Sequence, residues 1–330
     1  MPNPIRNVRR LGNTAVGTAV GRLIEAAAVV LGAATLIFII GSATGQTAAL
    51  ARLGPFASPE QIAAFEEANG LNDPIIVQYF RYIGRLLTGD FGNSLVTNQP
   101  IGEMILKALP VTISLALLAT LVAAVVSLVL GSLAAVFRDG PFDVIVRAFT
   151  SIGQSLPVFW VGLLGIQFFA IQLRWLPSGG FVPLTEDPVG WLRSMTLPVL
   201  ALSIPYSSVM TRIVRASMVE QLEKDYVRTA RGLGLPMGRI MVRNVIRNGL
   251  VAPVTVLALA LGGLLGGAVL VEAVYRLPGL GGLIVTAISQ RDFGIVAGAS
   301  IVAAAAFVIF NLLADLLQKK LNPRSVGDLS

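Results

Sequence analysis

The chain has 330 residues, of which 55% are hydrophobic and only 13% are charged. A soluble domain normally carries about 25% charged residues, so this chain lacks the charge that would cover a water-facing surface. Its mean hydropathy of +0.77 points the same way. The composition therefore predicts an integral membrane protein and argues against a soluble globular fold.

The sequence contains neither cysteine nor histidine. This removes disulfides, thiol redox chemistry, histidine-based acid–base catalysis and the usual zinc sites. No stretch fits the glycine-rich phosphate loop, so any ATP that this protein uses must be bound by another subunit. The net charge of +7 comes from basic residues between apolar runs, which is typical of a membrane protein and not of a nucleic-acid-binding one. We expect no cofactor and no metal in this chain.

Six apolar segments are candidates for crossing a bilayer, which takes about 20 residues. They cover residues 23–41, 108–136, 148–173, 195–210, 250–271 and 295–317. The fourth is the weakest, because Pro198 and Pro205 interrupt it. The first is longer than the apolar core of a signal peptide, so we expect it to be retained as a span. The predicted fold class is all-α, with six transmembrane helices.

Basic residues are concentrated on one side of these spans. They are Arg6, Arg9, Arg10, Arg22, Arg212, Arg215, Lys224, Arg228, Arg231, Arg239, Arg243, Arg247, Lys319, Lys320 and Arg324. The positive-inside rule then places both termini in the cytoplasm. The expected organisation is a cytoplasmic segment over residues 1–22, a transmembrane domain over 23–318 and a cytoplasmic tail over 319–330. Within the domain, residues of about 42–106 are external and those of about 212–247 are cytoplasmic.

Ionisable residues are nearly absent from the spans, with Glu25 and Asp315 near span ends and Glu272 just past the fifth span. Ion-coupled carriers keep buried charges because those charges do the coupling. The pattern therefore disfavours a secondary transporter or channel. An intramembrane enzyme is also disfavoured, since no histidine or lysine is available to activate a serine inside the membrane. A receptor or scaffold without transport is a further alternative, and it would have no ATPase partner.

Two overlapping pairs of glycines lie four residues apart in the fifth span. They are Gly262 with Gly266, and Gly263 with Gly267. This spacing predicts close helix–helix packing, either within the chain or at a subunit interface.

The segment 219–234 has apolar residues at helical spacing and charged residues on its other face. The apolar residues are Val219, Leu222, Tyr226, Ala230 and Leu233. Gly234 is placed to end this helix, and Pro236 suits the start of the next one. An amphipathic helix of this kind either lies on anionic lipid or docks into a cytoplasmic partner.

These residues closely resemble a known family. Residues 225–234 (DYVRTARGLG), followed by 243–248 (RNVIRN) and Pro253, resemble the "EAA" loop of ABC-importer permeases of the oligopeptide/dipeptide family. Further stretches resemble the same family in order along the chain. They are 70–74 (GLNDP), 89–94 (GDFGNS), 156–160 (LPVFW), 176–180 (LPSGG), 271–272 (VE), 278–281 (PGLG), 291–293 (RDF) and 315–324.

The resemblance implies a type I ABC-importer permease subunit of a bacterial plasma (inner) membrane, not itself an enzyme. Its coupling helix would contact the ATPase through residues in or beside the loop, which are Asp225, Tyr226, Val227, Arg228, Ala230, Arg231 and Gly234. Its implied partners are a second homologous permease, two ATPase subunits that bind ATP and Mg, an extracytoplasmic binding protein and the lipid bilayer. Peptides are the implied substrate, with nickel chelates or glutathione as alternatives.

The sequence departs from the family pattern at residues 44–47 (TGQT), at Gly232–Leu233 and at Pro236. In the external segment, Ser58 and Gln61 predict a capping box at the start of a helix that ends near Gly70. A second helix is expected from residue 74 to 87. Its aromatic residues suit either anchoring at the membrane interface or, by the resemblance, a platform for the binding protein.

Overall fold

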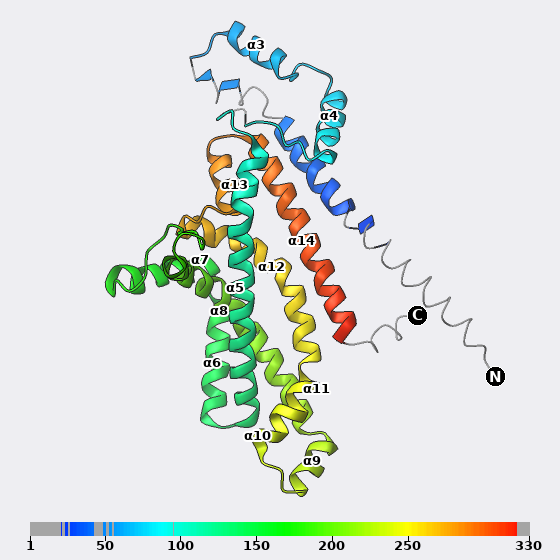
Figure 1. Ribbon diagram of the computed structural model, residues 1–330, viewed down its shortest axis with the longest axis vertical. Coiled ribbons are helices and arrows are strands. Elements are labelled where there is room, and N and C mark those ends of the chain that lie inside the picture. Colours follow the sequence, from blue (N-terminus) through cyan, green and yellow to red (C-terminus); the bar gives the residue numbers. More distant parts are fainter. Residues whose placement is uncertain are drawn as a thin grey trace, which may run out of the picture. The chain divides into compact units, whose positions relative to one another are not determined.

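Figure 1 shows the computed structural model, which describes residues 21, 24–25, 27–42, 49–50, 53–54, 56–94 and 96–321. The side chains of 258, 259, 261 and 314–321 are not among those described. The described part is almost entirely helical, and its one β-bridge joins Asn93 to Pro100. The chain forms two compact units, the first of Met1–Leu106 with Leu283–Leu312 and the second of Lys107–Gly282 with Leu313–Ser330. The predicted all-α class is confirmed, whereas the N-terminal arginines, residues 44–47 and Arg324 lie outside the described residues.

Three of the described helices are long and apolar enough to cross a membrane. They are α5 (Ile101–Val136), α8 (Pro188–Leu222) and the Phe293–Leu313 part of α14 (Phe293–Leu321). Three bent pairs qualify when each pair is taken together, which raises the number to as many as six. These pairs are Pro141–Ser155 with Val158–Gln172, Met237–Gly249 with Val251–Leu257, and Gly262–Tyr275 with Leu280–Ser289. A shorter apolar helix covers Ala27–Ser42.

The third apolar segment is not the single helix that the sequence predicted. It is divided into α6 (Pro141–Ser155) and α7 (Val158–Gly165), which continues as the π-helical η1 (Ile166–Gln172), with a bend of 105° at the break. Leu156 is extended, with φ −84° and ψ 128°, because the ring of Pro157 clashes with a helical conformation in the residue before it. The break is therefore a local effect of Pro157.

In α8 the outcome is the opposite: an expected interruption is absent. The helix runs unbroken over 35 residues through both Pro198 and Pro205, which were expected to interrupt this span. Its middle is largely buried, because α8 packs against α6, α7 and α12 (Val251–Tyr275). Neighbouring helices can offset the hydrogen bond that proline removes, so packing outweighs the local penalty here.

The second unit has two apolar cores along α8. The first contains Leu115 of α5, Met195 and Leu202 of α8, and Leu264 and Tyr275 of α12, all nearly or completely buried. The Tyr275 hydroxyl donates to the Gly162 carbonyl of α7 at 2.9 Å. This core joins α5, α7, α8 and α12 into one bundle.

The first unit contains the two helices that the sequence predicted in its external segment. The capping box at Ser58 and Gln61 is confirmed, and it opens α3 (Pro59–Ala68). The chain then turns at Gly70, whose φ is +64°. The next helix, α4 (Ile75–Leu87), begins directly after Pro74.

The start of α14 is held within the same unit. Asp292 accepts the backbone N–H of Ile295 at 3.3 Å, and the Ser94 hydroxyl donates to its other carboxylate oxygen. Gly298 of α14 lies against Ile101, where a side chain would not fit. The loop before α5 and the start of α14 therefore form one packed structure.

Candidate functional site

The segment with the strongest sequence signal forms a separate short helix beyond the end of α8. The predicted helix over 219–234 is divided: residues 219–222 are the last turn of α8, and α9 covers Asp225–Gly232. Lys224, extended with φ −69° and ψ 149°, separates the two. In Figure 1, α9 and α10 (Met237–Ile240) lie at one end of the second unit, below α6 and α11 (Arg247–Gly249). We call residues 223–240 the α9 corner.

One face of α9 is anchored in the second core of the unit. Val227 is completely buried and Ala230 nearly so, and they pack in a cluster with Met218 of α8, Ile240 of α10 and Val245 of the π-helical η2 (Met241–Ile246). Because small displacements in a close-packed core are transmitted to its neighbours, a force on α9 also acts on α8.

The buried face differs from the predicted one. Tyr226 and Leu233, which the sequence assigned to the apolar stripe, are 36% and 76% exposed. The reason is the break at Lys224, which starts α9 with its own orientation, so that Val227 and not Tyr226 faces the core. The side chain of Val227 is thus an anchor inside the chain.

The opposite face of α9 carries polar and charged groups. Arg228 lies 3.6 Å from the Asp225 carboxylate, and both side chains are largely exposed. The Tyr226 hydroxyl donates to the Gln221 side chain at 2.8 Å. Arg231 is also exposed, and its guanidinium lies 3.8 Å from the sulfur of Met237. Exposed ion pairs of this kind contribute little to stability, so this face is free to exchange its contacts for those of a partner.

The α9 corner ends in the turn that the sequence predicted. Gly234 has φ +75°, the left-handed conformation that glycine adopts without strain, and the Leu235 N–H donates to the Ala230 carbonyl at 3.2 Å. Pro236 directly precedes α10. The chain then continues through η2 and α11 into α12, so the corner connects α8 with α12.

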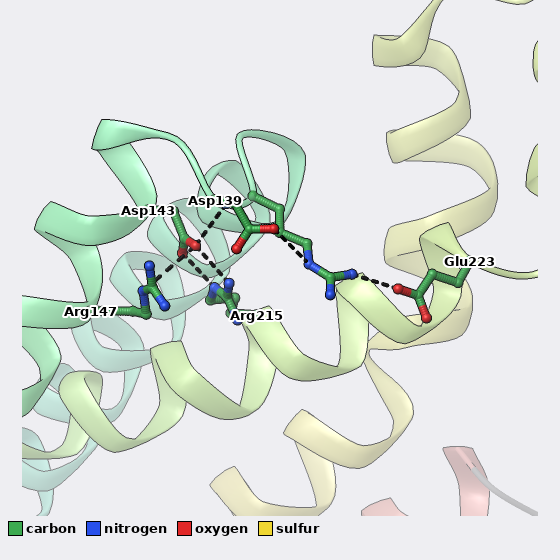
Figure 2. A network of polar contacts seen from close by, with 6 residues as sticks. Asp139, Asp143, Arg147, Arg215 and Glu223 are labelled. Atoms are coloured by element: carbon green, nitrogen blue, oxygen red, sulfur yellow. Dashed lines mark hydrogen bonds and ion pairs between the residues drawn. The ribbon is translucent and has the colours of Figure 1, made fainter.

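A buried carboxylate attaches α6 to α8 close to this corner (Figure 2). Asp143 of α6 is completely buried and accepts two hydrogen bonds from Arg215 of α8, at 2.5 Å from Nε and 2.7 Å from Nη2. The Asp139 N–H donates to the same carboxylate at 3.1 Å, and Arg147 lies 3.7 Å away. A planar guanidinium that binds both carboxylate oxygens determines orientation as well as distance.

The loop between α5 and α6 also contacts the turn before α9. Arg138, between α5 and α6, lies 2.5 Å from the Glu223 carboxylate and 3.5 Å from that of Asp139. The first turn of α6 therefore has a buried attachment to α8, through Asp143, and the loop before it has an exposed attachment to the α9 corner, through Arg138. No sequence pattern indicated this network, since Asp143 and Arg215 are 72 residues apart and an acid in the first turn of a helix is ordinary.

A second buried carboxylate holds the bend after α12. The sequence placed Glu272 just past the fifth span, but it lies inside α12 and is completely buried. Its carboxylate accepts the Thr112 hydroxyl at 2.6 Å and the N–H groups of Gly281 and Gly282 at 2.7 and 3.1 Å. Thr112 in turn accepts the N–H of Leu280 at 2.8 Å. These contacts satisfy the first N–H groups of α13 (Leu280–Ser289), which have no partner within a helix.

The predicted packing glycines of α12 do not all behave alike. A side chain at Gly267 would lie 3.0 Å from Leu202, and one at Gly263 would lie 3.2 Å from the Tyr206 hydroxyl, both on α8. Gly262 is buried, whereas Gly266 faces open space. Within this chain, the pair Gly263 and Gly267 therefore brings α12 close to α8.

Among the described residues, no group of three or more acidic side chains is arranged to hold a metal ion. The α9 corner offers exposed charged groups, a buried anchor and a mechanical connection to α8 and α12.

Comparisons with known proteins agree with this architecture. The family "Binding-protein-dependent transport system inner membrane component" matches residues 127–326, and the N-terminal family of such membrane components matches residues 18–116. A crystal structure of an amino acid ABC transporter with histidines matches with a TM-score of 0.51 at 16% identity, over 66% of this chain and 94% of that one. At this identity the structural match shows the fold alone.

Several curated relatives match over nearly their full length. A putative peptide transport system permease protein of Brucella suis biovar 1 is 37% identical over 303 residues, covering 92% of this chain and 96% of its own. The probable D,D-dipeptide transport system permease protein DdpB of Escherichia coli K12 is 37% identical, with 90% and 93% covered. The oligopeptide transport system permease protein AppB of Bacillus subtilis 168 is 33% identical, with 90% and 95% covered. This chain therefore belongs to the family of binding-protein-dependent transport system inner membrane components, the membrane-embedded permease subunits of ABC transporters.

Proposed function

We propose that this chain is a pore-forming subunit of an ATP-driven peptide importer, and that its ATPase partners act on it through the α9 corner. The relatives from three bacteria, at 33–37% identity, are all named for peptide or dipeptide transport, which supports peptides as the substrate class. No feature of the described residues favours a nickel chelate or glutathione instead.

The proposed coupling role rests on the difference between a buried and an exposed face of α9. Its buried residues Val227 and Ala230 belong to a core shared with α8, while Tyr226, Arg228 and Leu233 are exposed. A partner that binds the exposed face would therefore push on α8 through the core and would not merely displace a loose loop. ATP binding would close two ATPase subunits, move α9 and change which side of the membrane the pore opens to.

The proposed topology places both termini and the α9 corner in the cytoplasm, following the distribution of lysine and arginine. Six crossings would be made by the helix Ala27–Ser42, α5, the bent pair α6 and α7, α8, α12 and α14. Two homologous permeases would line the pore, and an extracytoplasmic binding protein would deliver the peptide to the external side. The chain is proposed to be non-catalytic, with ATP and Mg bound by the partners.

Single cysteines test the coupling contact, because the natural chain has none. We would place cysteine at Arg228 or Leu233 on the exposed face, at Val227 on the buried face, and at Gln61 in α3. Each variant would be co-expressed with its ATPase subunits and treated with a short bifunctional crosslinker, with and without ATP. We expect ATP-dependent crosslinks to the ATPase from Arg228→Cys and Leu233→Cys only.

The Val227→Cys variant is the matched control, since it lies on the same helix but faces inward. Equal crosslinking from both faces would mean that α9 unfolds or binds non-specifically. No crosslink from either exposed position, in a complex that still contains the ATPase, would reject the coupling role. The substrate is tested separately, by ATP-dependent uptake of labelled di- and oligopeptides into proteoliposomes that contain the whole complex with its binding protein.

A further inference from the structure

Two cavities follow one another along a single face of α8. The first, of about 690 Å³, is lined by Gly190, Arg193 and Ser194 at the start of this helix and by the loop after η1. The second, of about 190 Å³, is lined by residues 197, 200, 201 and 204 of α8 and by α7 and η1. Residues three, four and seven positions apart share one face of a helix. We call the two consecutive cavities together the α8 groove.

The first cavity of the α8 groove is basic. Arg174 and Arg193 both line it. Arg193 donates to the Trp175 carbonyl at 3.1 Å, whereas Arg174 has neither an ion pair nor a hydrogen bond among the described residues. A guanidinium is a planar fork of donors that matches the two oxygens of a carboxylate. This end of the groove can therefore bind an anionic group.

The backbone around Arg174 has two uncommon features. Arg174 is left-handed, with φ +54°, and it follows the seven-residue π-helix η1. Both kinds of backbone are found preferentially at functional sites, because the surrounding structure must hold them in place. The loop beyond is attached to α12: the Gly180 N–H donates to the Tyr275 carbonyl at 2.9 Å, and a side chain at Gly179 would lie 2.6 Å from the same oxygen. The basic cavity therefore has a fixed wall.

The second cavity is apolar. Phe168 of η1 and Leu197 and Leu200 of α8 line it, and the one hydroxyl in its lining, that of Tyr275, already donates to the Gly162 carbonyl. Leu197 and Leu200 follow Ser194 by three and six residues, which is about 5–9 Å along the helix. An apolar side chain can therefore occupy this cavity while a carboxylate joined to it lies at the arginines.

The edge of the basic cavity also carries a negative charge. A side chain at Gly190 would lie 2.5 Å from the Asp187 carboxylate, which caps α8 by accepting the Val189 N–H at 3.0 Å. Charges of both signs at one edge favour a ligand that carries both, such as a short peptide, over a simple anion.

We propose that the α8 groove binds the C-terminal end of the peptide cargo. Arg174 and Arg193 hold the terminal carboxylate, and the apolar cavity receives the side chain of the last residue. The proposal rests on the proposed function, whose topology places the loop after η1 on the external side, where the peptide arrives. It narrows the substrate class to peptides with a free carboxylate and an apolar C-terminal residue.

Protection of a single cysteine tests the groove in the purified complex with its ATPase subunits, in nanodiscs and without the binding protein. Leu200→Cys places a thiol in the apolar cavity, and its reaction with N-ethylmaleimide is followed by the mass of the intact chain. We expect the dipeptide Ala-Leu to slow this reaction. Adding Arg174→Gln should raise the peptide concentration for half-protection about tenfold, because a hydrogen bond to a charged group contributes on the order of 1.4 kcal/mol.

Two matched controls belong to the same end of the chain. Leu192→Cys lies on the other side of α8, outside both cavities, and its labelling should not respond to peptide. Arg276→Gln removes an exposed charge beside Tyr275 that lines neither cavity, and it should leave half-protection unchanged. Thermal unfolding of each variant verifies that it is folded.

The C-terminal amide of Ala-Leu identifies the group that is bound. It should protect Leu200→Cys about tenfold more weakly than the free acid, and Arg174→Gln should weaken it little further, since the carboxylate is already gone. Equal protection by acid and amide, or equal effects of Arg174→Gln and Arg276→Gln, would overturn the proposal.

Uptake of Ala-Leu by proteoliposomes with the binding protein separates this proposal from the proposed function. ATP-driven uptake without protection of Leu200→Cys would reject the groove and leave the function standing, whereas the loss of both would reject both. Labelling that depends on the phosphatidylglycerol content of the nanodisc and not on peptide would assign the groove to lipid. Protection that requires the binding protein would assign it to docking of that protein.

Discussion

Arg215 of α8 and Asp143 of α6 form a bidentate ion pair in which the carboxylate is completely buried and the guanidinium is about one-fifth exposed. The pair lies close to the α9 corner. The loop between α5 and α6, just before Asp143, contains Arg138, and Arg138 contacts Glu223 of that corner. The buried attachment sets the orientation of α6 on α8, and the exposed one links the same loop to the start of α9.

Replacing Asp143 with Asn should lower the stability of the purified chain by about 3 kcal/mol, since breaking a buried pair leaves a charge without its partner. The double variant Asp143→Asn with Arg215→Gln should be more stable than Asp143→Asn alone, because no unpaired guanidinium remains. Unfolding by denaturant in mild detergent would measure both. Asp139→Asn is the control: its side chain is 77% exposed, so we expect a loss of less than about 1 kcal/mol. A double variant less stable than Asp143→Asn would contradict the role of the pair.

Substitutions on the buried face of α9 should lower stability, whereas substitutions on its exposed face should lower coupling. Val227→Ala removes buried methyl groups and should cost about 2 kcal/mol of stability, as other core truncations do. Leu233→Ala removes an exposed side chain and should leave stability within about 0.5 kcal/mol, while lowering the peptide transported per ATP hydrolysed. Thermal unfolding and coupled transport and ATPase assays would test this. An unchanged transport ratio in Leu233→Ala would exclude this residue from the coupling contact.

Glu272 should keep the bend between α12 and α13 structurally ordered. Glu272→Ala leaves the buried N–H group of Gly281 without the acceptor that Glu272 provides, and a buried unsatisfied group costs about 1–3 kcal/mol. We therefore expect the amides of 280–282 to exchange with deuterium at least about tenfold faster, measured by mass spectrometry. Exchange at the start of α6, which has its own contacts, should not change. Unaltered exchange at 280–282 would mean that other groups hold this bend.

The glycines of α12 offer a matched pair of substitutions. Gly267→Val should destabilise the chain by about 1–3 kcal/mol, because the added side chain meets Leu202 of α8. Gly266→Val should change stability by no more than about 0.5 kcal/mol, since nothing lies within 4 Å of the added Cβ. Thermal unfolding of the isolated chain would measure both. If Gly266→Val instead prevents assembly while the chain stays folded, Gly266 lies at a subunit interface.

The amino-acid sequence alone determined the features that depend on composition or on a few neighbouring residues. The low charge predicted a membrane protein, the Ser58–Gln61 capping box predicted the start of α3, and Gly234 predicted the end of α9. Each of these depends on solvation or on backbone geometry within one or two turns. The resemblance of residues 225–234 to a known loop likewise needs no tertiary information.

The tertiary structure decided which side chains are buried and which residues meet. Packing kept α8 helical through Pro198 and Pro205, turned Val227 and not Tyr226 toward the core, and buried Glu272 of α12 against the first residues of α13. It also joined Asp143 to Arg215, between which no local pattern exists. The reason is that an apolar stripe specifies that a helix has a buried side, whereas the neighbouring helices determine which residues occupy that side.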